Sequence, residues 1–144
     1  MASCKWLLLL ILGVFFPVNA ADKADLEVEV SGLAPGEGQL IVSLFDEKKA
    51  WLKESREVLR EKVGDGESLI VVFPGLDEGQ YAVSVVYDQD GDGKMATGMF
   101  GIPKEPVGFS NNVRGKFGPA KWKQTHFYLD GDMRISIQVM DAIQ

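Results

Sequence analysis

The chain has 144 residues, with 15 Lys and Arg against 21 Asp and Glu, so its formal net charge at pH 7 is −6. This length suits one domain, and the acidic balance disfavours a sequence-independent nucleic-acid binder, which needs a basic surface for phosphate. The single Cys and single His exclude a disulfide framework, a Cys/His zinc site and a Cys–His nucleophile pair. We therefore expect no nucleic-acid partner.

The first twenty residues have the three-part layout of a secretory signal. Met1–Lys5 carries one positive charge, Trp6–Phe16 is apolar apart from Gly13, and Val18-Asn19-Ala20 places small residues at the −3 and −1 positions. A membrane anchor is disfavoured, because this apolar run would cross only about half of a ~30 Å hydrocarbon core. We expect residues 1–20 to be a signal peptide, which leaves no transmembrane anchor after cleavage.

The expected mature chain, residues 21–144, forms a single β-sandwich domain in this interpretation. It contains no Cys and no Asn-x-Ser/Thr sequon, so neither disulfides nor N-glycans point to a eukaryotic secretory route. A chain of this size buries about two-thirds of the surface that it exposes when unfolded, so it can be stable without disulfides. We expect a periplasmic or secreted protein.

Apolar and polar residues alternate with period two along much of the mature chain. Because successive side chains of a strand point to opposite faces, this alternation is typical of half-buried strands. The alternating positions fall in residues 26–30, 40–44, 69–73, 81–87, 127–129 and 135–139. Two sheets packed face to face would cover all of these apolar faces. The sequence therefore predicts an all-β fold, an antiparallel β-sandwich.

The segments between these strands predict turns, one short helix and one edge strand. Asp130-Gly131-Asp132 has the Asp-Gly dipeptide that is typical of a tight hairpin. Asp46–Ser55 combines an Asp at the capping position with good helix formers, so we expect one or two helical turns that close an end of the sandwich. Val58–Val63 is short and charged, which favours a protected edge strand.

Residues 89–119 hold seven Gly and three Pro and show little periodicity. Unstructured loops longer than about 12 to 15 residues are uncommon in compact domains and are usually functional or disordered. The segment also contains apolar residues that could fix it to the core: Met99, Phe100, Ile102, Phe109 and Phe117. We expect a long ordered loop, and we expect function there.

Three carboxylates stand at alternate positions where this loop begins. Ca²⁺ takes about 6 to 8 oxygen ligands, and an EF-hand loop supplies them from alternate positions followed by a backbone carbonyl. The candidate metal ligands are Asp88, Asp90, Asp92 and the carbonyl of Lys94. The position of the usual bidentate Glu is taken by Met99, so Glu105, Asn111 or Asn112 would have to complete the shell. Calcium is the candidate cofactor, and a solvated Asp/Gly turn remains the alternative.

Two further groups in the long segment could bind a ligand. The candidate ligand-binding residues are Glu105, Phe109, Ser110, Asn111, Arg114, Lys116 and Trp122. The first group, Glu105 to Asn111, lies among Gly and Pro residues that would make a rigid platform for a ligand. The alternative is a structural loop in which Asn111 and Asn112 only bond the backbone. The second group, Arg114 to Trp122, interleaves cations with aromatic rings and could bind an anionic sugar, a lipid head group or a negatively charged partner. The alternative is a solvated surface whose aromatic side chains point into the protein.

The sequence favours a non-catalytic function. His126 stands alone without a recognisable Ser partner, so it is more typical of a structural residue than of a general base. The leading hypothesis is a binding or accessory module of the cell envelope, whose partner is an unknown envelope protein or a small ligand. The alternatives are an envelope hydrolase or lyase that uses Asp88, Asp90, Glu105 or His126, and a structural protein that assembles through an edge strand.

Several motifs along residues 81–112 resemble a known bacterial family. They are Tyr81-Ala82-Val83, Tyr87-Asp88, the Asp/Gly loop that ends in Gly93-Lys94, Gly101-Ile102-Pro103, Glu105, and Gly108-Phe109-Ser110-Asn111-Asn112. This pattern resembles the secreted family catalogued as domain of unknown function 2141, over nearly all of the mature chain. The resemblance implies a secreted sandwich of immunoglobulin-like or transthyretin-like kind, with no established activity. The chain has Tyr87 and Ala96 where this family commonly has His and Asp.

A second resemblance concerns Phe73–Val83, which is similar to the Pro-Gly-Leu…Gly-x-Tyr turn of transthyretin-like domains. In those domains the Tyr follows a corner between two strands and packs its ring inward. The resemblance implies this role for Tyr81.

Overall fold

The computed structural model describes residues 22–95, 98, 103–116 and 118–141. The expected signal, Met1–Ala20, lies outside the described residues, as do Ala96, Met99, Phe100, Ile102 and Phe117. Within the described ranges, no helix is both long enough and apolar enough to cross a membrane.

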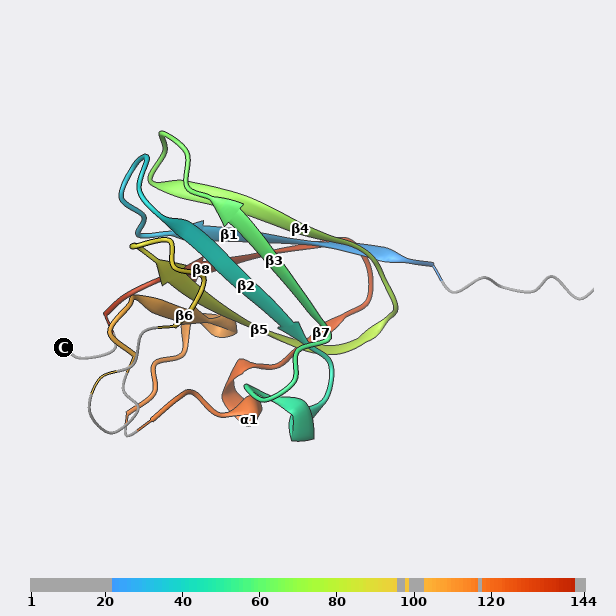
Figure 1. Cartoon of the computed structure of the whole chain (residues 1–144). Helices are drawn as coiled ribbons and strands as arrows, with labels where there is room; N and C mark the ends of the chain where they lie inside the picture. Colours follow the sequence, from blue (N-terminus) through green and yellow to red (C-terminus); the bar gives the residue numbers. More distant parts are fainter. Residues whose placement is uncertain (1–21, 96–97, 99–102, 117, 142–144) are drawn as a thin grey trace, which may run out of the picture.

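Two β-sheets pack face to face (Figure 1). The three-stranded sheet has the order β4-β1-β8 and consists of β1 (Ala24–Ser31), β4 (Ser68–Leu76) and β8 (Met133–Gln138). The second sheet has the order β3-β2-β5-β6 and consists of β2 (Gln39–Phe45), β3 (Glu57–Lys62), β5 (Gly79–Asp88) and β6 (Val107–Phe109), with β7 (Phe127–Leu129) also paired to β5. The predicted all-β sandwich is confirmed.

The core consists of the apolar faces that the alternation predicts. The buried inward-facing residues include Leu26, Val28, Val30, Leu40, Val42, Leu44, Val71, Phe73, Tyr81, Val83, Val85, Tyr87 and Ile137. Burying a side chain of this kind stabilises the fold by about 1.5–3 kcal/mol relative to leaving it in water. The period-two pattern therefore identified which side chains of these strands are buried between the two sheets.

Two expectations about strand pairing were wrong. β1 pairs with β4 in antiparallel fashion but with β8 in parallel, so the three-stranded sheet is mixed. The Asp130-Gly131-Asp132 turn does not close a hairpin, because β7 pairs with β5 and β8 pairs with β1. The turn instead carries the chain from one sheet to the other. The alternation of side chains specifies which face is buried, but it does not specify which strand lies alongside.

The helical segments are shorter than expected and partly in other places. Asp46–Ser55 contains one turn of 3₁₀ helix, η1 (Lys48–Ala50), and Glu47 before it makes no capping bond through its side chain. The α-helix α1 (Trp122–Thr125) and the 3₁₀ helix η3 (Ser110–Asn112) follow β6, where the sequence showed no helical pattern. The charged edge strand is confirmed as β3.

The long segment after β5 completes the edge of that strand. β6 pairs with Ser84, Val85 and Val86, and the amide of Tyr87 donates to the carbonyl of Pro106 at 2.9 Å. Nearer the start of β5, the amide of Val83 donates to Ser110 Oγ at 3.0 Å. β7 pairs with the first residues of the strand. Residues 106–110 of the expected loop are thus held against β5 by hydrogen bonds.

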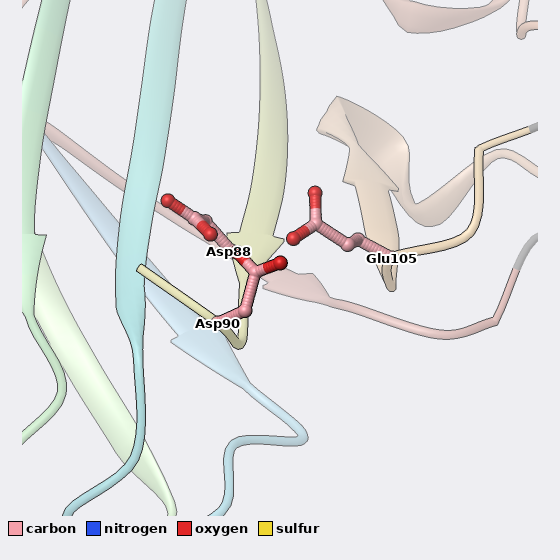
Figure 2. A group of neighbouring side chains, drawn as sticks. All are labelled: Asp88, Asp90 and Glu105. Atoms are coloured by element: carbon pink, nitrogen blue, oxygen red, sulfur yellow. The ribbon is translucent and has the colours of Figure 1, made fainter. Parts of the chain in front are cut away.

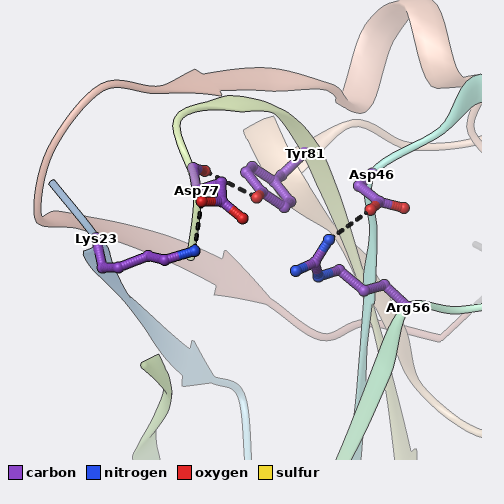
Figure 3. Close-up of polar contacts among 5 residues, drawn as sticks. All are labelled: Lys23, Asp46, Arg56, Asp77 and Tyr81. Carbon is purple, nitrogen blue, oxygen red and sulfur yellow. Dashed lines mark hydrogen bonds and ion pairs between the residues drawn. The ribbon is translucent and has the colours of Figure 1, made fainter. Parts of the chain in front are cut away.

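Tyr81 forms the corner that the transthyretin-like resemblance implies. Its ring is buried and its hydroxyl donates to the carbonyl of Asp77 at 2.8 Å (Figure 3). Burial raises the pKa of the Tyr81 hydroxyl. An ion pair with Lys23 ties Asp77 to the start of β1 and lowers the pKa of the Asp77 carboxyl. A second ion pair, also drawn in Figure 3, joins Arg56 to Asp46 at 2.8 Å. These exposed pairs contribute little to stability.

We predict that Tyr87→Phe lowers the free energy of unfolding by about 1–3 kcal/mol. The Tyr87 hydroxyl accepts from the amide of Ala34 at 3.1 Å and donates to the carbonyl of Glu37 at 3.0 Å, so the substitution leaves both groups without this partner. The matched control is Tyr128→Phe, whose hydroxyl bonds to Glu78 on the surface and whose loss should cost within about 0.5 kcal/mol. Urea unfolding measures both, and equal losses would contradict the prediction.

Candidate metal centre

Asp88 ends β5 in a position where its carboxylate is completely buried. β2 and β5 are in register so that Gln39 lies opposite Asp88, and Gln39 Nε2 donates to Asp88 Oδ2 at 2.7 Å. The amides of Gly91 and Gly93 donate to Oδ1 and Oδ2, each at 2.8 Å. Three donors therefore replace the hydration that the carboxylate loses on burial.

The loop after Asp88 turns tightly around that carboxylate. Gly91 and Gly93 have φ values of 71° and 76°, in the left-handed region that Gly adopts without steric cost. Asp90 Oδ1 accepts from the amide of Asp92 at 3.1 Å, and Asp92 Oδ1 accepts from the amide of Lys94 at 2.7 Å. Successive turns of this kind bring the exposed side chain of Asp90 back toward Asp88.

Glu105 reaches the same place through the pairing of β6 with β5. The antiparallel register matches Ser84 with Phe109 and Val86 with Val107, and the bond from Tyr87 to Pro106 continues it by one step. The next step places Glu105 beside Asp88, which lies at the end of the neighbouring strand. Like Asp88, Glu105 is buried.

The structure thus brings three carboxylates together from two separate segments. One ligand oxygen from each of Asp88, Asp90 and Glu105 lies within 4.8 Å of the other two (Figure 2). Like charges at such distances repel strongly unless a cation or a shared proton compensates them. Hard cations such as Ca²⁺ prefer carboxylate and carbonyl oxygens. The group could therefore hold a metal ion.

The pKa of Asp88 shows how the protein keeps this carboxyl ionised. Burial is the largest single influence and raises the pKa, because it disfavours the charged form. The hydrogen bonds that Asp88 accepts from Gln39, Gly93 and Gly91 act in the opposite direction, and the pKa of Asp88 lies below its ordinary value. At neutral pH Asp88 therefore offers a negatively charged oxygen as a metal ligand.

The predicted metal ligands contribute unequally. Asp88 and Asp90 belong to the group, and of the three residues considered for the rest of the shell, Glu105 belongs to it as well. Asp92 is not in the group of three, and its carboxylate accepts from the amide of Lys94. Asn111 and Asn112 lie elsewhere, since they bond to backbone groups of residues 124–138.

Several of the predicted ligand-binding residues hold the fold together. Ser110 is fully buried and donates to the carbonyl of Thr125 at 2.6 Å. Asn111 has φ 63° and donates to the carbonyls of Gln124 and His126 at 3.0 and 3.2 Å. These are the bonds expected of a structural loop, the alternative to a ligand platform.

The aromatic members of the predicted set pack inward and the cations stay outside. Trp122 is buried, stacks on His126 with ring centroids 5.7 Å apart, and contacts Trp51 at 6.0 Å. Phe109 is half-buried and lies 6.0 Å from the same Trp51 ring. Arg114 and Lys116 are exposed, and Arg114 is near the sulfur of Met140.

Two residues that position the site were not identified from the sequence. Gln39 lies on another strand, and only the β2–β5 register reveals that it faces Asp88. Gly38 has φ 71°, and a Cβ there would come within 2.4 Å of the carbonyl oxygen of Asp88. A Gly-x-Gly pair just before a strand is a weak signal for such a close approach.

We predict that Asp88→Asn lowers the free energy of unfolding in metal-free buffer by about 1–3 kcal/mol. An amide keeps one acceptor oxygen and presents an NH₂ group to a backbone donor, and relief of repulsion from Glu105 offsets only part of that cost. Asp65→Asn is the matched control, because Asp65 is exposed between β3 and β4, outside the acidic group, and its substitution should change stability by less than about 0.5 kcal/mol.

Acidification checks the same contribution. Because the pKa of Asp88 is lower in the folded chain than the unfolded value of about 3.9, its stabilising effect is present above the unfolded pKa and is lost as pH falls through the folded one. The difference between wild type and Asp88→Asn should therefore shrink below about pH 4. Equal stability of wild type and Asp88→Asn near neutral pH would show that the hydrogen bonds contribute nothing net.

Comparisons with known proteins agree with the resemblance noted in the sequence. No curated protein matches the chain, and no solved structure matches it. The model of a family described as an uncharacterised protein conserved in bacteria (DUF2141) matches residues 28–137, which include β1 to β8 almost entirely. The chain therefore belongs to the bacterial family DUF2141.

Proposed function

We propose that this protein is an exported binding or accessory module of the cell envelope, in which Asp88, Asp90 and Glu105 hold one calcium ion. The observation that carries the metal part is the convergence of three carboxylates from two segments that β5 and β6 bring side by side. Export is supported by the charged, apolar and small-residue parts of residues 1–20.

The chemistry of the site favours calcium over softer metals. All three side chains offer oxygen, and the site contains neither His nor Cys, the ligands that zinc and copper prefer. Carbonyls such as that of Lys94, the carboxylate of Asp92 and water would supply the rest of a shell of about 6 to 8 oxygens. Flexible shells of this kind suit Ca²⁺ better than Mg²⁺, which demands nearly ideal octahedral geometry.

The ion would act as a clamp on the long segment. Asp88 ends a core strand, whereas Glu105 begins the segment that pairs with it. A cation between them would offset the repulsion of two buried carboxylates and fasten the two segments to each other. The clamped segment would then present a fixed surface to a partner.

We predict that millimolar calcium raises the midpoint of thermal unfolding by several degrees relative to chelator. A ligand bound only to the native state at about 100 times its Kd adds about 2.7 kcal/mol of stability. Glu105→Gln should abolish most of the shift. Glu61→Gln, an exposed carboxylate on β3, should retain it. An unchanged midpoint in wild type, measured by calorimetry, would refute the calcium site.

The convergence also supports the rival hypothesis of a hydrolase or lyase. Two neighbouring carboxyls in different environments can divide the roles of acid and base. His126, the other candidate, is far from them in the fold: it follows α1 and stacks on Trp122, near the start of β5 rather than its end. Turnover of an envelope polymer that disappears in Glu105→Gln would favour the enzyme over the binding module.

An assembly role is supported by one edge strand. β4 lies at the edge of the three-stranded sheet and carries no charged residue, and its outward residues Ile70 and Val72 are 44% and 42% exposed. Uncharged edges of this kind tend to pair with other chains. The molar mass of the purified protein in solution distinguishes this candidate, since an accessory module that works alone would be a monomer.

A further inference from the structure

A lysine-rich surface lies at the end of the sandwich opposite the acidic group. Lys48, Lys49 and Lys53 line a shallow open groove together with Glu47 and Trp51. Trp51 Nε1 donates to the carbonyl of Ala120 at 2.8 Å and its ring lies 6.0 Å from that of Trp122, so α1 lies beside the groove-lining Trp51. Figure 1 shows α1 at this end of the sandwich. We call this surface the lysine end; it consists of Lys48, Lys49, Leu52, Lys53, Lys121 and Lys123.

Leu52 is presented to solvent at the tip of a strained turn. Trp51 has φ −51° and ψ 123°, Leu52 has φ 56°, and the amide of Lys53 donates to the carbonyl of Ala50 at 2.9 Å. This is a type II turn, in which the position of Leu52 favours Gly or Asn. A non-Gly residue in this region of φ is strained. The Leu52 side chain is nevertheless 39% exposed.

The net charge of the lysine end is opposite in sign to the net charge of the whole chain. After removal of Lys5 with the expected signal, the chain has 14 cations and 21 acids, a net charge of 14 − 21 = −7. The lysine end holds five lysines, and two exposed acids lie among them: Glu47, which is paired with Lys49 at 3.0 Å, and Glu54, which follows Lys53. Lysines therefore outnumber acids around the one exposed leucine, and this end has a net positive charge.

The register of β2 and β5 separates the two charged ends. Gln39 lies opposite Asp88, whereas Phe45, just before the lysine end, lies opposite Ala82. Six residue steps at about 3.3 Å place the ends roughly 20 Å apart. A negative surface that attracts the lysine end would therefore leave the acidic group facing away from it.

We propose that the lysine end docks on a lipid bilayer that contains anionic headgroups, with Leu52 inserted at the interface. A basic surface with one exposed apolar anchor suits a membrane surface, because the lysines are attracted to anionic lipid and the leucine gains from leaving water. An acidic protein would provide the charge, but it would give no general reason for a strained, exposed leucine. This docking goes beyond the calcium site and does not depend on it.

The test is co-sedimentation of the protein, purified in the form that accumulates in the producing cells, with lipid vesicles in the presence of chelator. We expect binding to vesicles that mix phosphatidylglycerol with phosphatidylcholine and none to pure phosphatidylcholine. Binding should weaken as salt rises. Chelator is essential, because calcium could otherwise bridge the acidic group to the same lipids and imitate docking.

Three substitutions separate the contribution of charge from that of the apolar anchor. Each of Lys48→Gln and Lys53→Gln should weaken binding about fivefold, the equivalent of about 1 kcal/mol for one lysine at an anionic surface. Leu52→Gly should weaken binding several-fold while the midpoint of unfolding stays level or rises, since Gly suits φ 56°. Lowered affinity with undiminished stability is an outcome that misfolding does not produce.

The matched controls lie away from the lysine end. Lys62→Gln removes a lysine from β3, where Lys62 pairs with Gln39 near the acidic group, and Ile70→Thr removes an exposed apolar side chain from β4. Both should bind as wild type does. Absence of binding to anionic vesicles, or equal loss in the controls, would overturn the proposal. Binding to polyglutamate but not to vesicles would do the same and would assign the surface to an acidic macromolecule.

Discussion

Asp88 holds a charged carboxylate at the buried end of a core strand, and such a charge is stable only when hydrogen bonds replace its lost water. Those bonds come from Gln39 on the neighbouring strand and from Gly91 and Gly93 in the following loop. One side chain thereby couples the register of β2 and β5 to the path of the loop. The pairing of β6 with β5 places Glu105 beside Asp88, whose carboxylate these bonds hold in a fixed position and in its charged form. A cation between the two carboxylates would balance their charges.

The two ends of the same strand pair have opposite character. At one end carboxylates gather around Asp88, and at the other a cluster of aromatic rings supports lysines and an exposed leucine. The aromatic cluster is compact because Phe45 and Trp51 pack edge to face at 4.9 Å and Trp122 covers the outer face near Ala82. In our proposals one end orients the module on a membrane, and the other stiffens the segment that faces a partner.

The sequence predicted the sandwich and its buried faces well, because each depends on a local period-two pattern. The Asp loop was identifiable from the spacing of its carboxylates, and the corner role of Tyr81 from a resemblance carried by Phe73–Val83, because both signals lie within a short stretch of sequence. The parallel pairing of β1 with β8, the course of the Asp130 turn and the support from Gln39 all depend on contacts between distant segments, to which local patterns are blind. Glu105 was among the residues considered, but only the β5–β6 register distinguishes it from Asn111 and Asn112.

The most direct test of the central claim is anomalous diffraction from crystals of the protein soaked with a lanthanide, which substitutes for calcium and scatters strongly. The account predicts one dominant peak bonded to carboxylate oxygens of Asp88, Asp90 and Glu105, at roughly the 2.3–2.6 Å that Ca²⁺ adopts. Peaks only at scattered surface carboxylates, with no density between these three side chains, would contradict it.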